Sequence, residues 1–151
     1  MEKRMKSIKI KKVRPGARIP QRATPGSAGL DLSACLDEPF TLAPGERALI
    51  PTGIAAELPD ENCAALIYAR SGLAVKHGVA LSNGVGVVDS DYRGELRVGL
   101  CNLGKEPYTI QPGERIAQLV VSPVLALPVE EAGELAETGR GSGGFGSTGK
   151  A

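Results

Sequence analysis

Glycine and proline interrupt this chain so often that a long helix is excluded. Glycine loses much conformational entropy in a helix, and proline lacks the backbone N–H that a helix needs. The 151 residues include 20 glycines and 11 prolines. Many lie in turn-like segments, such as Pro44-Gly45, Pro51-Thr52-Gly53 and Pro112-Gly113, which separate short apolar runs. This pattern predicts many short strands joined by turns.

The expected strands share short length and enrichment in apolar residues. They cover Ser7–Lys11, Leu30–Ala34, Arg47–Ile50, Ile54–Glu57, Cys63–Tyr68, Val79–Leu81, Gly86–Val88, Glu95–Asn102, Tyr108–Ile110 and Ile116–Val121. One short helix is expected over Ser71–His77, with Ser71 as its cap and Gly78 just past its end. We therefore predict an all-β, jelly-roll-like sandwich or barrel with one short helix.

Composition and length indicate one domain followed by an arm. Hydrophobic residues make up 42% of the chain, enough for a single core. After Val129 an acidic run leads into Arg140–Gly149, which is nearly all Gly, Ser and Thr. Such a segment cannot bury enough apolar area to order itself. We expect a β domain over residues 1–138 and a flexible, glycine-rich arm over 139–151 that closes over an active site.

Charge and cysteine content exclude several kinds of partner. The net charge of +1 gives no reason to expect a nucleic acid or a membrane surface. Residues 1–22 are strongly basic, but their alternating pattern favours a strand with solvated lysines over a nucleic-acid-binding arm. The three cysteines form no CxxC pair and there is one histidine, so a zinc site is not expected. Reduced cysteines and the lack of a long apolar run predict a cytoplasmic protein.

The glycine-rich tail imitates two nucleotide-binding motifs. Gly141–Gly146 fits the letters of GxGxxG, and Gly144–Lys150 nearly fits a P-loop. Both motifs require a helix immediately afterwards, so that phosphate meets the helix N-terminus. No helix can follow so close to the end of the sequence, and we reject both.

Five polar and glycine-rich clusters lie between the apolar runs. They are Ala28-Gly29-Leu30-Asp31-Leu32, Arg70-Ser71-Gly72-Leu73-Ala74, Asn83–Gly94 with its Asp-Ser-Asp-Tyr-Arg-Gly end, Gly113–Gln118, and Arg140–Gly149. In this order they resemble the five motifs of the trimeric dUTPase family, from about Thr24 to Gly149. Each motif is weak alone, whereas five in order are specific.

The resemblance implies a site for each part of dUTP. Asp89 matches the catalytic carboxylate that activates the attacking water. Asn83, Gly86, Tyr92 and Phe145 match the residues that bind the base and sugar. Arg70, Ser71, Gly72, Gln118, Arg140, Ser147 and Thr148 match the phosphate ligands. The same residues also suit purely structural roles. Asp89 could form an Asx turn, and Asn83-Gly84 could form a type I′ hairpin turn.

The same resemblance implies Mg²⁺ as cofactor and a homotrimer with active sites at subunit interfaces. The metal is expected on the triphosphate and water, with Asp31 structural or in the outer shell rather than a direct ligand. The implied activity is hydrolysis of dUTP to dUMP and pyrophosphate, which limits uracil in DNA and supplies dUMP for dTMP synthesis. The alternatives are a dCTP deaminase, possibly bifunctional, and a non-enzymatic nucleotide-binding regulator.

Overall fold

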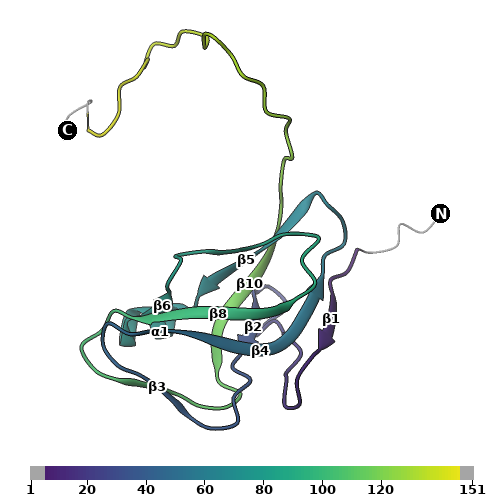
Figure 1. Cartoon of the computed structure of the whole chain (residues 1–151), viewed down its shortest axis with the longest axis vertical. Helices are drawn as coiled ribbons and strands as arrows, with labels where there is room; N and C mark the ends of the chain where they lie inside the picture. Colours follow the sequence, from purple (N-terminus) through teal and green to yellow (C-terminus); the bar gives the residue numbers. More distant parts are fainter. Residues whose placement is uncertain (1–5, 147–151) are drawn as a thin grey trace.

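The computed structural model describes residues 6–146 and contains two four-stranded antiparallel sheets (Figure 1). The first sheet has the order β1-β4-β8-β6, with bounds Lys9–Lys12, Arg47–Glu57, Glu95–Asn102 and Val79–Leu81. The second has the order β2-β10-β5-β7, with bounds Leu30–Ser33, Arg115–Pro123, Cys63–Ala69 and Gly86–Val88. A small third sheet pairs β3 (Phe40–Leu42) with β9 (Tyr108–Ile110). This is the predicted all-β, jelly-roll-like fold.

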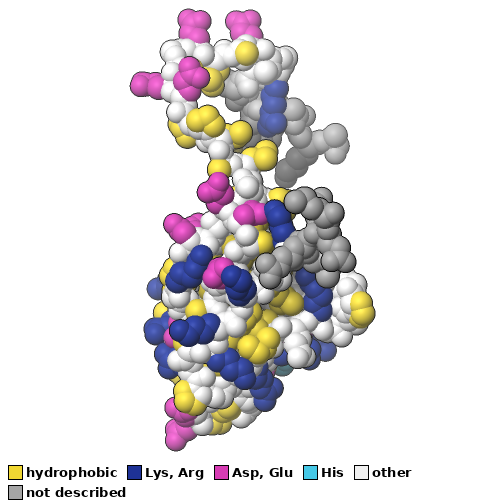
Figure 2. Space-filling view, turned by 90° about the vertical axis from the view of Figure 1, so that its right-hand side faces the viewer, with side chains coloured by type: hydrophobic (Ala, Val, Ile, Leu, Met, Phe, Trp, Pro, Cys, Tyr) yellow, Lys and Arg dark blue, Asp and Glu magenta, His cyan; other side chains and the backbone are white. Residues whose placement is uncertain are grey.

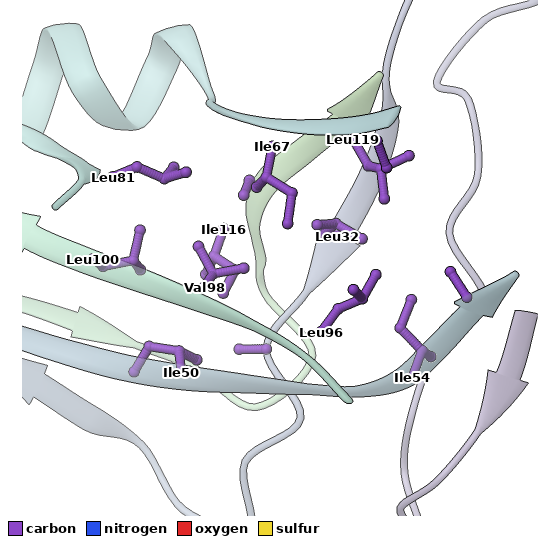
Figure 3. Close-up of a cluster of buried hydrophobic side chains, with 14 of the residues drawn as sticks. Leu32, Ile50, Ile54, Ile67, Leu81, Leu96, Val98, Leu100, Ile116 and Leu119 are labelled. Atoms are coloured by element: carbon purple, nitrogen blue, oxygen red, sulfur yellow. The ribbon is translucent and has the colours of Figure 1, made fainter. Parts of the chain in front are cut away.

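Aliphatic side chains fill the space between the two large sheets. In β8 the buried residues Leu96, Val98 and Leu100 alternate with more exposed neighbours, as one face of a strand requires. Ile67 and Leu119 meet them from the second sheet, and Figure 3 shows both sets pointing into one cluster. Burial of this apolar surface is the main stabilising term in such a sandwich.

The predicted turn at Pro51-Thr52-Gly53 is wrong, because β4 runs through it. The register against β8 shifts between Pro51 and Ala55, so the segment is a bulge within one strand. Gly53 has φ of 71° and its N–H donates to the Glu95 carboxylate. A Cβ at residue 53 would lie 2.8 Å from Cys35 Sγ, so close packing as well as backbone conformation selects glycine there.

Helix α1 covers Ser71–His77, as predicted, but Ser71 is not its cap. Arg70 takes the N-cap position with extended backbone (φ −86°, ψ 131°), because it directly continues β5, and its side chain makes no capping hydrogen bond. Gly78 ends the helix in the left-handed conformation with φ of 70°. No helix in residues 6–146 has the length and apolar character needed to cross a membrane.

The chain leaves the sheets after β10. Figure 1 shows this C-terminal segment running away from the body. Its acidic side chains stand apart from the many basic ones on the body in Figure 2. The apolar residues Leu125, Leu127 and Val129 are almost fully exposed on it. The predicted arm and its boundary at residue 138 stay a prediction.

Candidate active site

The segment that joins β6 to β7 passes from one sheet to the other. β6 pairs with β8, whereas β7 pairs with β5, so the two strands do not form the hairpin that the sequence suggested. Among the described non-glycine residues only Phe145 has a positive φ, which rules out a type I′ turn at Asn83-Gly84. The Gly84 N–H instead donates to the carbonyl of Leu81 at 3.1 Å. The crossing exposes the backbone around Gly86 at the sandwich surface.

A cavity of about 330 Å³ opens beside this crossing. Its wall includes the predicted base, sugar and catalytic residues Asn83, Gly86, Tyr92 and Asp89. A Cβ at residue 86 would lie 3.2 Å from Ile67 Cβ, so glycine avoids crowding at this part of the wall. We call this cavity the base pocket.

Asp89 follows β7 directly and is exposed at the edge of the base pocket. Its carboxylate forms no ion pair or hydrogen bond with any residue between 6 and 146, and its backbone carbonyl accepts from Tyr92 N–H at 3.2 Å. The carboxylate is therefore free to accept a proton from a water molecule.

Tyr92 is held in place by its neighbours in sequence. Its hydroxyl donates to the backbone carbonyl of Glu95 at 3.1 Å. Burial raises the pKa of Glu95, but hydrogen bonds from Arg14, the Gly53 N–H and Arg97 outweigh it and lower that pKa below its usual range. These contacts fix the charged Glu95 at the start of β8. Its backbone carbonyl in turn accepts the hydrogen bond from the Tyr92 hydroxyl.

A second cavity of about 200 Å³ contains the predicted phosphate ligands of the folded body. It is lined by Arg70, Ser71, Gly72 and Gln118, together with Ala23, Ser27, Gly29, Asp31 and Arg115. Strand register explains the grouping, because Gln118 pairs with Asp31 on one side and Tyr68 on the other. We call this cavity the phosphate cradle.

Asp31 organises the cradle's cations. One oxygen lies 3.6 Å from Arg70 Nε and the other 3.1 Å from Arg115 Nη1. Arg70 Nη1 also donates to the carbonyl of Arg115 at 3.0 Å. Sequence reasoning did not assign Arg115, although it lies in the quoted fourth cluster, because its partner is 84 residues away.

Gln118 is oriented by backbone and by a missing side chain. Its amide donates to the Ala69 carbonyl at 3.0 Å. A Cβ at residue 29 would lie 2.5 Å from its Oε1, so Gly29 makes room for the amide. The first cluster thus supports the fourth, which no local pattern reveals.

The base pocket and the phosphate cradle share no lining residue. Val88, just before Asp89, pairs with Ala65, whereas Arg70 lies five residues further along the chain, directly after β5 ends at Ala69. At about 3.4 Å per residue, Ala65 and Arg70 are about 17 Å apart. One chain therefore does not bring Asp89 next to the cradle.

The arm residues lie apart from both cavities within the chain. Arg140 Nε donates to the Gly143 carbonyl at 2.7 Å, and Phe145 is fully exposed with φ of 52°. Ser147 and Thr148 lie outside the described residues. The structure thus groups the predicted site residues into a base pocket, a phosphate cradle and a separate arm.

Comparison with known proteins gives a consistent result. The dUTPase family model matches residues 16–149. A deoxyuridine 5'-triphosphate nucleotidohydrolase of Desulfitobacterium hafniense is 53% identical, over 96% of this chain and 99% of the relative. One of Burkholderia thailandensis is 52% identical, over 95% of this chain and 97% of the relative. The dUTPase of Staphylococcus bacteriophage 80alpha, solved with dUPNHPP, superposes with a TM-score of 0.87 at 28% identity, covering 97% of this chain and 100% of that one. By sequence and fold, this chain belongs to the dUTPase family.

Proposed function

We propose that this protein hydrolyses dUTP to dUMP and pyrophosphate. The family match over residues 16–149 supports this activity, as do relatives above 50% identity that carry the name of the hydrolase. The observation that carries the chemistry is the unpaired Asp89 carboxylate at the edge of a cavity of about 330 Å³. No feature of the described residues favours a deaminase or a purely regulatory role.

Asp89 acts as the general base in this proposal. It orients a water molecule and accepts its proton while the water oxygen bonds to the α-phosphorus. The bond from that phosphorus to the bridging oxygen breaks, and pyrophosphate leaves. The exposed, unpaired state of the carboxylate supports this role, since its oxygens are free to accept a hydrogen bond from water.

Asn83 and Gly86 bind the uracil edge, and Tyr92 lies under the deoxyribose. The low backbone wall at Gly86 supports close approach of the base, and the tethered Tyr92 ring supports exclusion of a ribose 2′-hydroxyl. Phe145 of the arm stacks on the bound base. A rigid wall rejects a 5-methyl group better than loss of one apolar contact, which gives only about 1–3 kcal/mol.

Arg70, Ser71, Gly72 and Gln118 hold the phosphates, and Arg140, Ser147 and Thr148 of the arm join them. Support comes from the cradle geometry, where Asp31 fixes Arg70 while leaving donors for phosphate oxygen. Guanidinium groups suit phosphate because they donate two parallel hydrogen bonds.

The active site is completed in a homotrimer. Within one chain about 17 Å separates the end of β7, which carries Asp89, from Arg70, so another copy brings Asp89 to a phosphate held by Arg70. The exposed apolar residues Leu125, Leu127 and Val129 also favour contact between copies. The family resemblance supplies the number three.

Mg²⁺ is the proposed cofactor, bound to triphosphate oxygens and water. Residues 6–146 contain no group of three or more His, Cys, Asp or Glu side chains placed to hold a metal ion. Asp31 is already engaged by two arginines and is assigned no direct metal bond. When bound, the ion neutralises phosphate charge.

A cytoplasmic location is supported by the free thiols of Cys35, Cys63 and Cys101.

A nucleotide panel tests the activity. Purified protein with Mg²⁺ is expected to release pyrophosphate from dUTP and to leave dTTP, UTP and dCTP almost unchanged. Asp89→Asn should keep nucleotide binding and lose about 100-fold or more in kcat, the usual contribution of a general base. Asp91→Asn is the matched control, because Asp91 is exposed and lines neither cavity. Ammonia release from dCTP, or wild-type kcat in Asp89→Asn, would contradict the proposal.

A further inference from the structure

A third cavity, of about 310 Å³, adjoins the phosphate cradle. The two cavities share Ala23, Asp31 and Arg115 in their walls. The remaining wall consists mainly of polar side chains from the segment before β2, namely Arg18, Gln21 and Arg22, with Ser33 from β2. We call this cavity the arginine pocket.

Backbone carbonyls hold two of its guanidinium groups in place. Arg18 Nη1 donates to the Gly113 carbonyl at 3.0 Å. Arg22 Nη1 donates to the carbonyls of Ser27 and Ala28 at 2.6 and 2.7 Å. Both contacts fix orientation, and neither neutralises charge, because a carbonyl carries no net charge.

The pocket therefore has an excess of positive charge. Three arginines line it, and its single acidic residue is Asp31. That carboxylate is already shared between Arg115 and Arg70. Arg18 and Arg22 form no ion pair with any acid among residues 6–146, so their charges are available to an anion.

Position and chemistry select the anion. A guanidinium group donates two parallel hydrogen bonds to phosphate oxygens. An anion with two phosphoryl groups can therefore contact several arginines at once. The pocket adjoins the cradle that would hold the triphosphate, and the two share Arg115 in their walls. A group released there meets the next positive surface in the arginine pocket.

We propose that the arginine pocket is a separate binding site for pyrophosphate, which receives the leaving group next to the phosphate cradle. The identity of this anion as a product rests on the proposed function. The site itself depends only on Arg18, Arg22 and Arg115, and inorganic pyrophosphate can occupy it without turnover. Such a site lets pyrophosphate bind while nucleotide still fills the cradle.

Calorimetric titration of the full-length protein with inorganic pyrophosphate in Mg²⁺-free buffer tests the site. The wild type is expected to bind two pyrophosphate ions per chain, one in the cradle and one in the arginine pocket. The double variant Arg18→Gln and Arg22→Gln should bind one, or show at least about tenfold weaker binding at the second site. Arg18→Lys with Arg22→Lys keeps the charge and should retain part of the affinity. Arg47→Gln is the control, because Arg47 is exposed and lines none of these cavities.

Steady-state kinetics provide a second readout. Added pyrophosphate should lower kcat for dUTP in the wild type, because an occupied pocket blocks departure of the leaving group. In the double Gln variant the inhibition should become purely competitive with dUTP. Competitive inhibition alone in the wild type would overturn the proposal.

Two further outcomes would also overturn it. One is unchanged two-site binding in the double Gln variant. The other is binding of a single pyrophosphate per wild-type chain that rises to two in a variant of the C-terminal segment. In that variant four acidic residues are changed to Gln, namely Glu130, Glu131, Glu134 and Glu137. This result would mean that their carboxylates occupy the pocket in the wild type. Absence of dUTP turnover in the wild type would instead overturn the proposed function, and the pyrophosphate titration would remain interpretable.

Discussion

The Tyr92 ring occupies the space that a side chain at Gly94 would need. A Cβ built on Gly94 would lie 2.4 Å from Tyr92 Oη and 2.6 Å from Cζ. Gly94 does not have a positive φ, so space rather than backbone conformation requires glycine there. The position of the ring thus depends on an absent side chain two residues away.

Gly94→Ala should therefore weaken discrimination between dUTP and UTP. The added methyl group displaces the ring that would exclude a ribose 2′-hydroxyl, and we expect the ratio of kcat/KM values to fall about tenfold, or ~1.4 kcal/mol. Initial rates with both nucleotides measure it. Gly133→Ala is the control, since a Cβ there meets nothing within 4 Å. An unchanged ratio would show that the Tyr92 ring does not select the sugar.

Asp31→Asn tests whether this carboxylate positions arginines or binds metal. Loss of the two ion pairs frees Arg70 and Arg115. We expect kcat/KM for dUTP to fall about tenfold. The Mg²⁺ concentration that gives half the maximal rate should stay the same, because Asp31 is assigned no direct metal bond. Rates measured across a Mg²⁺ titration decide the matter, and a large rise in the required concentration would make Asp31 a metal ligand.

Removal of residues 139–151 should reduce kcat while the oligomer persists. The arm contributes Arg140 and Phe145 to the proposed site, and its loss leaves bound nucleotide open to water. We expect a loss of about 100-fold in kcat, similar to removal of one strong transition-state donor. Initial rates and light scattering measure activity and assembly. Removal of Lys150 and Ala151 alone is the control, and wild-type kcat in the longer truncation would eliminate the arm's role.

Tyr108 should make stability depend on pH in the alkaline range. Burial, followed by the hydrogen bond from its hydroxyl to Glu114, raises the pKa of Tyr108 from about 10 to about 12. The folded state therefore favours the neutral phenol, and this stabilisation is complete below pH 10 and lost as pH rises through 12. Thermal unfolding between pH 9 and 12 should show a steeper fall in Tm for the wild type than for Tyr108→Phe. Parallel curves for the two proteins would contradict this pKa.

Local rules in the sequence predicted the elements well. Gly78 ends α1 as expected, because a helix C-terminus often needs a left-handed residue. The strand predicted over Glu95–Asn102 is β8, with the same bounds. Pro51-Thr52-Gly53 misled, since a turn and a bulge both call for glycine, and only pairing with β8 distinguishes them.

The sequence by itself determined the strand-rich fold, the short helix and the clusters whose order identifies the family, because steric limits and side-chain alternation act between near neighbours. Only the tertiary structure decided that β6 and β7 belong to different sheets, that Asp31 joins Arg70 to Arg115, and that Asp89 and Arg70 lie about 17 Å apart along β5. These relationships depend on which distant strands pair and in what register. Local residue patterns restrict that choice, but packing of the whole core makes it.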